Sequence, residues 1–583
     1  MPFDAFVLQC IAGEIEEKLI FTRARITKIY QPGSTELLIH FRGEMKSHTL
    51  LLSAHPARAR IHFTTRHFPS PPAPPPFCML LRKHLTGASV VSLEQTPLER
   101  VLKIHLRVIN AQGGEGQKTL VAEIMERRSN LILLDAPAAE KKQIILGAVK
   151  AVPPFLNRFR TILPHHAYVP PPPQDKIHPL ALDYNFFVLE AEQEQGRPVT
   201  NFLLDKLRGF SPFLAREIAA RAGGNVVSKE AAPLLWQKIQ ELLQIATDNK
   251  WEPTMLCNEE GKPHDFTSFV PRQAGSGTPR RFQSMSELVD EFYLFREKNE
   301  EKENLQQLIN RQMRHYIEKA RKKEKNQLLE LDNAGKAEQY RLYGELLKLN
   351  LHNVPEKAVA VCLPNVYSKE GETVKISLEP YLSPSANAQR YFKKYRKAIT
   401  AAKKIAARLA ATRQEIAYLE SVLFSAEKSD WQGLQEIRIE LEEAGYLPRR
   451  LQHPEQENNS SFKPYKFITA EGEEILVGRN NRQNDLLLRQ ANATDLWFHA
   501  KEMPGAHVIL KGAQPGKEAI EAAALLAAGH SRGAHSANVP VDYTTVKNVR
   551  RIPGARPGMV TYTGYRTIFV TPDHKKLTAL LQP

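Results

Sequence analysis

One stretch near the middle of the chain, from Tyr391 to Leu423, carries apolar or small side chains at alternating steps of four and three residues. A repeat of 3.5 residues keeps one face of a helix against a partner helix, as in a coiled coil. At a rise of about 1.5 Å per residue the stretch would form a rod of roughly 48 Å. Thr412 is the one polar member of this seam, which consists of Tyr391, Tyr395, Ala398, Ala402, Ile405, Leu409, Thr412, Ile416, Leu419 and Leu423.

The partner helix is expected in the same chain, between Ser284 and Leu331, where the composition is also helical. Its second half departs from a strict heptad, so the register of the pairing is open. The apolar positions at helical steps are Leu288, Phe292, Phe295, Ile309, Met313, Ile317 and Ala320. Residues 284–432 are therefore predicted to form a long antiparallel coiled-coil hairpin.

The outer faces of this hairpin are basic. The cations are Lys393, Lys394, Arg396, Lys397, Lys403 and Lys404 on the second helix and Arg321, Lys322, Lys323 and Lys325 on the first. Such a run is typical of a solvated helix face, and equally of a projecting hairpin that reaches a large anionic surface. The whole chain has a formal net charge of +16 and a pI near 9.4, which favours a polyanionic partner such as a nucleic acid.

Several classes of protein are disfavoured. The four cysteines, Cys10, Cys78, Cys257 and Cys362, are far apart and include no C-x-x-C pair, which argues for a reducing compartment and against a disulfide framework. The chain starts without a signal-peptide pattern and contains no run of about 18 apolar residues. We expect a cytoplasmic protein with no membrane partner.

No motif of covalent chemistry stands out. His499, His507, His530 and His535 have no carboxylate at ligand spacing beside them, so a metal site is not expected. The sequence lacks a P-loop and a G-x-G-x-x-G turn between a strand and a helix. We therefore predict a non-enzymatic protein without a metal or cofactor.

Residues 1–179 are predicted to form a compact N-terminal domain of mixed helix and sheet. A short amphipathic helix is expected over Phe77–Leu85, and the proline-rich stretches are Pro69–Pro76 and Pro170–Pro173. Alternating or β-branched runs predict strands at Arg25–Tyr30, Glu36–Phe41, Thr49–Leu52, Ala88–Gln95, Arg100–Val108, Leu120–Ile124 and Asn130–Leu134. Glu99 and Arg100 lie at a turn there, where they form either a local surface pair or a polar contact for RNA.

Residues 180–283 are predicted to hold a helix–turn–helix unit. Gly209 breaks one helix, Ser211 can cap the next with Pro212 in its first turn, and Gly223 ends it. Such a unit can offer a helix N-terminus to a phosphate, and it is equally often an ordinary helix corner. A small stranded return is expected over Trp251–Phe269.

A polar linker is predicted over residues 433–462, clearest at Pro454–Ser461, and a C-terminal α/β domain over residues 463–583. Its expected helix is Ala519–His530. Its expected strands are Tyr465–Thr469, Ile475–Gly478, Leu496–His499, His507–Leu510, Met559–Tyr562 and Thr567–Thr571.

Three loops of that domain, Gly478–Asp485, Asp495–His507 and Val541–Arg551, combine cations with aromatic rings. Cationic side chains bind phosphates, while aromatic and imidazole faces stack on unpaired bases. Strand alternation places Asp495, Trp497 and His499 on one side and Leu496 and Phe498 on the other. Trp497 is either core or part of the surface. The candidates are Arg479, Arg482, Lys501, Lys547, Arg550 and Arg551, with Trp497, Phe498, His499 and Tyr543.

Long motifs of this sequence resemble the NFACT family over nearly the whole chain. In the N-terminal part they are Phe77–Leu85 and Glu123–Asn130; in the middle, Tyr340–Leu347 and Asn387–Lys397; and in the C-terminal part, Asp495–Lys501 with Pro504–Val508, Val541–Thr544 and Arg556–Val560. Three positions depart from the family pattern: Glu99 replaces the usual aspartate before Arg100, Glu126-Arg-Arg128 stands for Gly-Arg-His, and Ala506 replaces a common serine.

The resemblance implies a multidomain α+β protein with an N-terminal lobe, a helix–turn–helix segment, a coiled-coil hairpin and an RNA-binding domain. It implies a role in ribosome quality control. The protein would bind a large ribosomal subunit that still holds peptidyl-tRNA, recruit alanyl-tRNA, and promote untemplated addition of alanine to the stalled chain. The ribosome would make the peptide bond.

The resemblance also assigns roles to residues. Glu99 and Arg100 would bind tRNA. Lys393, Lys394, Arg396 and Lys397 would contact the ribosome near ribosomal RNA and the stalk-base protein. The C-terminal RNA-binding set would be Asp495, Trp497, His499, Lys501, His507, Lys547, Arg550 and Arg551.

Two other functions stay open from the sequence. A surface adhesin that binds fibronectin would need a signal peptide or anchor, and neither pattern is recognisable. A DNA glycosylase would use Pro2 as its N-terminus, but Phe3 stands where such enzymes need an acid, and Cys362 is the last cysteine, too early for a late zinc finger.

Overall fold

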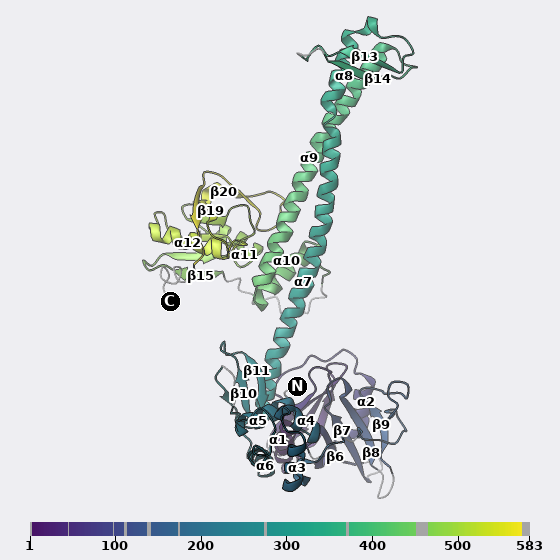
Figure 1. Ribbon diagram of the computed structural model, residues 1–583, viewed down its shortest axis with the longest axis vertical. Helices are drawn as coiled ribbons and strands as arrows, with labels where there is room; N and C mark the ends of the chain where they lie inside the picture. The colour runs from purple at the N-terminus through teal and green to yellow at the C-terminus, as the bar shows by residue number, and fades with distance from the viewer. Residues whose placement is uncertain are drawn as a thin grey trace. The chain divides into compact units, whose positions relative to one another are not determined.

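The computed structural model describes residues 3–44, 46–96, 98–109, 114–136, 142–172, 175–272, 277–368, 372–449 and 464–573 (Figure 1). The chain divides into two compact units, Met1–Lys298 and Asn299–Pro583. Helix and sheet are mixed in both units, as expected from the sequence. Within the described residues, no helix is both long enough and apolar enough to cross a membrane.

The first unit is built on a nine-stranded antiparallel sheet with the order β4-β3-β2-β1-β5-β6-β7-β8-β9. One face packs against α1 (Ala5–Ile15) and α2 (Pro76–Leu85) in a single large core. The strands are β1 (Arg25–Tyr30), β2 (Glu36–Arg42), β3 (Ser47–Ser53), β4 (Arg60–Phe63), β5 (Ser89–Gln95), β6 (Val101–Ile109), β7 (Glu115–Glu123), β8 (Asn130–Ala136) and β9 (Ile144–Ala148). Seven of these are the strands that alternation predicted, and β4 and β9 are additional.

A bundle of four helices follows the sheet: α3 (Tyr184–Gln193), α4 (Val199–Lys206), α5 (Pro212–Ala222) and α6 (Ala232–Thr247). The hydroxyl of Ser211 accepts a hydrogen bond from the Leu214 amide and caps α5, which ends at Gly223 in the left-handed conformation. The bundle is joined to α7 by β10 (Thr254–Cys257), β11 (Pro263–Thr267) and β12 (Arg280–Arg281).

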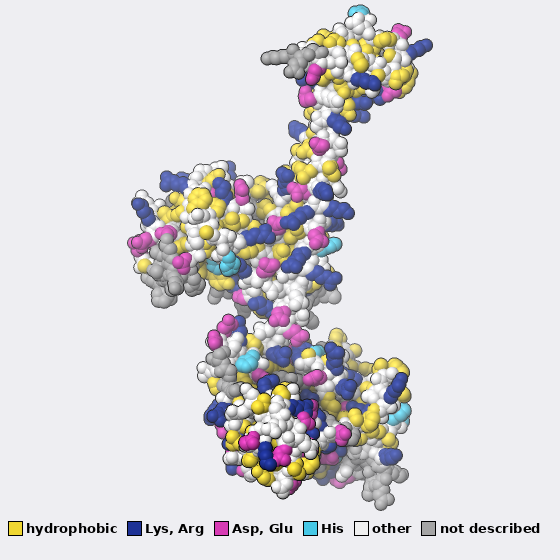
Figure 2. Space-filling view, in the orientation of Figure 1, with side chains coloured by type: hydrophobic (Ala, Val, Ile, Leu, Met, Phe, Trp, Pro, Cys, Tyr) yellow, Lys and Arg dark blue, Asp and Glu magenta, His cyan; other side chains and the backbone are white. Residues whose placement is uncertain are grey.

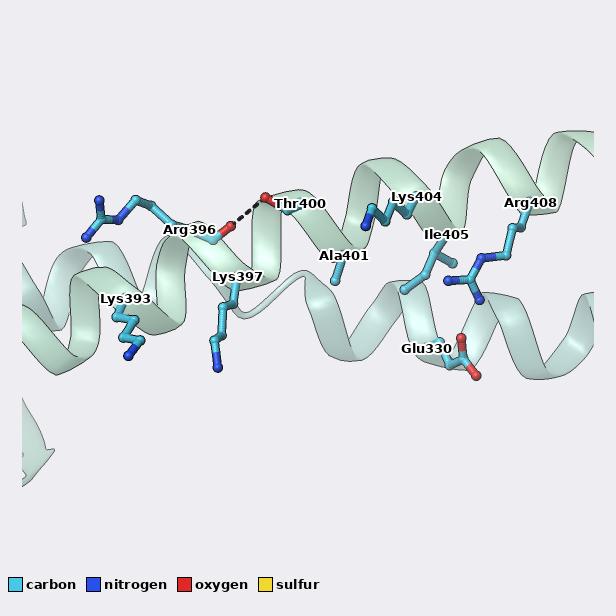
Figure 3. Close-up of a pocket in the computed structure, with 9 residues that line it drawn as sticks. All are labelled: Glu330, Lys393, Arg396, Lys397, Thr400, Ala401, Lys404, Ile405 and Arg408. Atoms are coloured by element: carbon cyan, nitrogen blue, oxygen red, sulfur yellow. Dashed lines mark hydrogen bonds between the residues drawn. The ribbon is translucent and has the colours of Figure 1, made fainter.

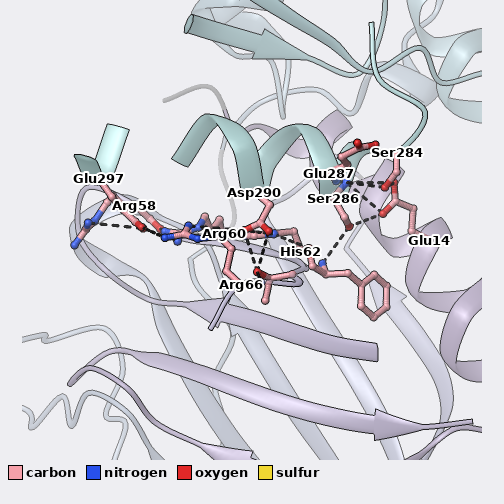
Figure 4. A network of polar contacts seen from close by, with 12 residues as sticks. Glu14, Arg58, Arg60, His62, Arg66, Ser284, Ser286, Glu287, Asp290 and Glu297 are labelled. Atoms are coloured by element: carbon pink, nitrogen blue, oxygen red, sulfur yellow. Dashed lines mark hydrogen bonds and ion pairs between the residues drawn. The ribbon is translucent and has the colours of Figure 1, made fainter. Parts of the chain in front are cut away.

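The start of α7 (Met285–Ala334) is fixed to the sheet by a polar network (Figure 4). The Glu14 carboxylate accepts hydrogen bonds from the Ser284 hydroxyl at 3.0 Å and the Met285 amide at 2.6 Å. About three turns further along α7, Glu297 pairs with the buried Arg60 of β4 at 2.9 Å. The charged guanidinium of Arg60 on β4 is therefore buried because α7 supplies its counter-charge.

In the second unit, the rest of α7 runs antiparallel to α9 (Pro384–Lys428). The side-chain amide of Gln306 donates to the Ala426 carbonyl at 2.8 Å, and Arg321 pairs with Glu420 at 2.6 Å, so residue numbers rise on one helix as they fall on the other. All ten predicted seam positions of α9 are buried or half-buried. We call this part the helix pair.

The far end of the helix pair is closed by α8 (Ala337–Leu349), β13 (Ala360–Pro364) and β14 (Thr373–Ser377), which share a small core with the start of α9. The near end holds α10 (Trp431–Glu443), whose Leu434, Ile437 and Leu441 are buried against α7 and α9. The linker predicted over 433–462 is wrong at its start, because this apolar stripe makes a packed helix. Its clearest part, Pro454–Ser461, lies outside the described residues.

The C-terminal domain has a six-stranded antiparallel sheet with the order β15-β16-β18-β17-β19-β22. The alanine-rich α12 (Lys517–Gly529) covers one face, and α11 (Asn481–Gln490) with a β20–β21 hairpin covers the other. The strands are β15 (Tyr465–Ile468), β16 (Glu474–Val477), β17 (Leu496–Ala500), β18 (Val508–Leu510), β19 (Val539–Thr545), β20 (Val549–Arg551), β21 (Val560–Tyr562) and β22 (Arg566–Val570).

Two of the three predicted loops are wrong as loops. Residues 478–485 hold the cap and first turn of α11, with Asn480 accepting the Gln483 amide. Residues 541–551 hold most of β19, a 3-10 turn and β20. Both stretches are polar in sequence because they bury polar side chains against other elements, which conceals their regular structure.

Candidate nucleic-acid interface

Glu99 and Arg100 lie at one end of the nine-stranded sheet, in the turn between β5 and β6. The Glu99 amide donates to the Thr96 carbonyl at 2.9 Å, and the Ile124 amide donates to the Arg100 carbonyl at 2.8 Å. Both side chains are half-buried. The turn therefore holds the two charged groups in place at the end of the sheet.

The same turn touches the helical bundle. Gly209 has φ of +78°, and a Cβ there would lie 2.2 Å from the Leu98 carbonyl oxygen, so only glycine allows this approach. Beside it, Arg208 lies 3.6 Å from a carboxylate oxygen of Glu99. The predicted pair of Glu99 and Arg100 is thus joined by a second arginine, Arg208, from the helical bundle.

Asp4 completes this cluster. Its carboxylate caps α1 by accepting the Val7 amide at 3.0 Å, and it accepts the Ser211 hydroxyl at 3.1 Å. Burial raises the pKa of Asp4, while these hydrogen bonds and the charge of Arg100 act in the opposite direction. Asp4 and Arg208 were not predicted; the only sequence signals were a capping residue before an apolar run and a cation beside a glycine.

The predicted ribosome-contacting cations lie on α9, along an open groove of about 670 Å³ between the two helices (Figure 3). Lys393, Arg396 and Lys397 are exposed, whereas Lys394 is half-buried over the rings of Tyr340 and Tyr391. Figure 2 shows Lys and Arg side chains along the helix pair. The residues that line the groove are Glu330, Lys393, Arg396, Lys397, Thr400, Ala401, Lys404, Ile405 and Arg408.

Trp497 is fully buried in the C-terminal domain, on the sheet face that α11 and the β20–β21 hairpin cover. Its ring is stacked with His499, with centroids 5.7 Å apart, and meets His507 edge-on at 5.3 Å. Burial lowers the pKa of His499 to about 4 and that of His507 well below its usual value, so both imidazoles are neutral at pH 7.

Asp495 is also buried, and its carboxylate accepts the amides of Asn492 and Gly512 at 2.8 and 3.1 Å. Asp495, Trp497 and His507 are therefore buried residues that support the 495–507 segment from inside the domain. The side chain of His499 is only half-buried. The predicted alternation holds, because Leu496 and Phe498 pack on the opposite face, against the core of α12.

The predicted cations differ in their surroundings. Lys547 and Arg550 are exposed, and Arg551 pairs with Asp485 at 2.5 Å. The Lys501 ammonium lies 3.9 Å from a carboxylate oxygen of Asp542 and 5.2 Å from the centre of the Tyr565 ring.

Two tyrosines near Lys501, Tyr562 and Tyr565, were not predicted as site residues. The Tyr562 hydroxyl donates to Asp542 at 2.9 Å, and Tyr565 is 45% exposed next to it. The alternation of aromatic and basic residues in Tyr562-Thr-Gly-Tyr-Arg566 was the available signal.

Arg479 and Arg482, which the sequence placed among the RNA-binding cations, face α10 and its preceding turn. Arg479 pairs with Asp430, and Arg482 lies 3.6 Å from Glu443. Their contacts help to hold the C-terminal domain against the helix pair.

Comparison with known proteins agrees with this architecture. The family description "NFACT N-terminal and middle domains" matches residues 4–460, and "NFACT protein RNA binding domain" matches residues 463–564. The Rqc2 homolog RqcH of Bacillus subtilis is 35% identical over 586 residues, which cover 98% of each chain. The Rqc2 homolog RqcH of Streptococcus pneumoniae is 34% identical over 585 residues, which cover 100% of each chain.

Among solved structures, the fibrinogen binding protein from Staphylococcus aureus is 27% identical, covering 50% of this chain and 99% of that one with a TM-score of 0.43. A superposition this poor carries no argument about function. The two family matches together span nearly the whole sequence, in the order of the domains described above. The chain therefore belongs to the NFACT family.

Proposed function

We propose that this protein is a non-enzymatic ribosome quality-control factor. It binds a large ribosomal subunit obstructed by peptidyl-tRNA and recruits alanyl-tRNA. It thereby promotes untemplated addition of alanine to the C-terminus of the stalled chain, which marks that chain for degradation. The observation that carries the proposal is the end-to-end similarity to Rqc2 homologs RqcH.

The charges of the molecule support a role in positioning RNA. Cations gather at three separate places: the sheet end around Arg100, the groove of the helix pair, and the surface near Lys547 and Arg550. In this proposal the sheet end binds tRNA, the helix pair reaches ribosomal RNA and the stalk-base protein, and the C-terminal domain binds RNA. Holding aminoacyl-tRNA in place lowers the entropic cost of a reaction that the ribosome catalyses.

The test begins with purified protein and purified large subunits that carry peptidyl-tRNA. Sedimentation should show binding to these subunits, and sequencing of the bound tRNA should show enrichment of alanine tRNA. Mass spectrometry of the nascent chains, after addition of alanyl-tRNA, should show C-terminal alanine tails. If the protein binds the subunits but no alanine tails form, the tailing part of the proposal is wrong. If the protein does not bind, the whole proposal is wrong.

Charge reversal tests the helix pair within the same assay. Replacing Lys393, Arg396 and Lys397 with glutamate should weaken subunit binding and flatten its dependence on salt, since each lost phosphate contact changes the log–log slope by roughly 0.7–0.9. Reversal of Lys229, Lys250 and Lys262, three exposed lysines of the first unit, is a matched control for net charge. If the first variant keeps the affinity and the salt slope of the parent, its three cations do not contact the ribosome and form only a solvated helix face.

A further inference from the structure

The end of the nine-stranded sheet that carries Arg100 also carries an exposed aromatic turn, residues 153–160, which we call the aromatic turn. Its Phe155 side chain is 84% exposed, Leu156 is 67% exposed and Phe159 is 56% exposed. Large apolar side chains that gather on a surface in this way mark contact sites for other molecules.

The aromatic turn is held rigidly. Arg160, its last residue, donates to both carboxylate oxygens of the buried Glu123 at 2.6 Å, and the Tyr168 hydroxyl donates to the same carboxylate at 3.0 Å. Backbone hydrogen bonds between Val152 and Ile162 close its base. A buried charge pair of this kind fixes geometry, so the exposed rings are presented in a defined position.

Backbone and core contacts place the aromatic turn near Arg100. The β7–β8 turn bonds to the Arg100 carbonyl through Ile124, and its far side bonds to the Lys150 backbone through the Asn130 side chain at 2.8 and 3.0 Å. Met125 of that turn packs in the same small core as Val152. The turns at 99–100, 125–129 and 150–160 therefore occupy one end of the sheet.

This end of the sheet is rich in arginine. Arg127 and Arg128 of the β7–β8 turn are exposed, as is Arg158 in the aromatic turn itself, and the acids at the same end include Glu126 and the half-buried Glu99. Guanidinium groups bind phosphates, and aromatic rings stack on bases whatever their identity. Exposed phenylalanines interleaved with arginines are therefore suited to unpaired nucleotides more than to a purely apolar protein face.

We propose that the aromatic turn binds unpaired nucleotides of the tRNA, with bases stacked on Phe155 and Phe159 and phosphates held by Arg127, Arg128 and Arg158. The site continues the Glu99–Arg100 surface, and this inference rests on the proposed function, in which that surface binds tRNA. It names the part of the tRNA that the surface takes: a single-stranded loop or end rather than a duplex.

The test measures binding of the full-length protein to a tRNA transcript, to its isolated stem-loop and to a duplex of equal length. The double variant Phe155→Ala, Phe159→Ala should weaken binding to the tRNA and the stem-loop about five-fold or more, since each stacked base contributes a factor of this size or larger. Binding to the duplex should not change.

Two further variants separate stacking from simple apolar contact. The Phe155→Leu, Phe159→Leu protein keeps an apolar surface without a ring and should bind as weakly as the alanine variant, whereas Phe155→Trp, Phe159→Trp should bind at least as tightly as the parent. Phe21→Ala is the matched control, because Phe21 is 77% exposed and precedes β1 at the opposite end of the same sheet. It should bind tRNA like the parent.

The possible failures are distinguishable. If the parent protein does not bind tRNA, the proposed function itself is overturned. If the parent binds and the alanine variant binds equally well while its melting temperature is unchanged, only this inference is overturned. Parent-like binding by the leucine variant would also overturn it, since an apolar protein contact would then explain the exposed residues.

Discussion

The aromatic turn of the N-terminal domain and the Trp497 cluster of the C-terminal domain are made of similar residues in opposite positions. Phe155 and Phe159 stand mostly in solvent, whereas Trp497 is fully enclosed by His499, His507 and Tyr562. Aromatic rings beside cations can therefore lie on the surface of one domain and in the core of another.

The difference comes from strand pairing. Trp497 lies on β17, which pairs with β18 on one side and β19 on the other, and α11 with the β20–β21 hairpin closes over its face. Phe155 follows β9, the last strand of its sheet, in a turn that leaves its side chain exposed among the residues that the structure describes. Trp497 is therefore buried by the strands and the helix around it, whereas Phe155, in a turn at the edge of its sheet, is exposed to water.

The largest expected effect is the loss of stability on removing the buried ring. Trp497→Ala should destabilise the C-terminal domain by about 3–5 kcal/mol, because it leaves a large cavity in a small core. Phe155→Ala, at an exposed position, should change the free energy of unfolding by less than about 0.5 kcal/mol. Denaturant unfolding of both variants checks the comparison, which fails if the two losses are similar.

Alternation and capping were enough to predict most of the fold. Seven strands of the first sheet and all six expected strands of the C-terminal domain were found where the pattern placed them. β4 was not predicted because the polar residues Arg60 and His62 occupy buried positions, so the strand shows no inward-facing apolar pattern. These two side chains are buried only because Glu297 and Asp290 reach them from α7, and Glu297 is 237 positions away from Arg60.

The candidate sites were less predictable, for the same reason. The turn at Glu99 and Arg100 was identified from two adjacent residues, but Asp4 and Arg208 join it only through the packing of α1 and the helical bundle against the sheet. Similarly, nothing local distinguishes Arg479, which pairs with Asp430, from the exposed Arg550. Long-range partners decide which cations are available to RNA, and a single sequence does not reveal them.

Arg100→Ala should weaken tRNA binding by about 1.5–3 kcal/mol, the usual loss for a charge-assisted contact. Binding to the large subunit alone should persist. Arg107→Ala is the control, because Arg107 lies exposed toward the other end of β6, the strand that follows Arg100. Filter binding with a tRNA transcript measures both, and equal affinities would mean that the sheet end is not the tRNA surface.

The buried carboxyl group of Glu440, on α10, should make the stability of the folded protein depend on pH. Burial raises the pKa of Glu440, which accepts the Tyr418 hydroxyl at 2.8 Å, from its usual 4.5 to about 7. Between these values the unfolded chain releases the proton and the folded protein keeps it, so stability falls as pH rises from 4.5 to 7. Glu440→Gln cannot ionise and should remove this fall, on the order of 2 kcal/mol, when melts at pH 5 and pH 8 are compared. Equal pH dependence in parent and variant would contradict it.

The smallest effect is expected where the Trp497 cluster reaches the surface. His499 is half-buried over Trp497, and Lys501 lies just beyond β17 between Asp542 and Tyr565. Truncating both to alanine removes polar groups at the edge of the domain and leaves the buried ring in place, so the melting temperature should stay within a few degrees.

The same double variant should lose about 1 kcal/mol or more of binding to tRNA or ribosomal RNA, because it removes the charged hydrogen bond of Lys501 and the polar ring of His499. Lys511→Ala is the control for charge, since Lys511 pairs with Glu474 after β18, away from Tyr565. If the double variant unfolds, and its folded fraction still binds RNA like the parent, then His499 and Lys501 belong to the support together with Trp497. The contact surface of this domain would then lie on Lys547 and Arg550 instead, which a second pair of alanine substitutions would reveal as a loss of binding without a loss of stability.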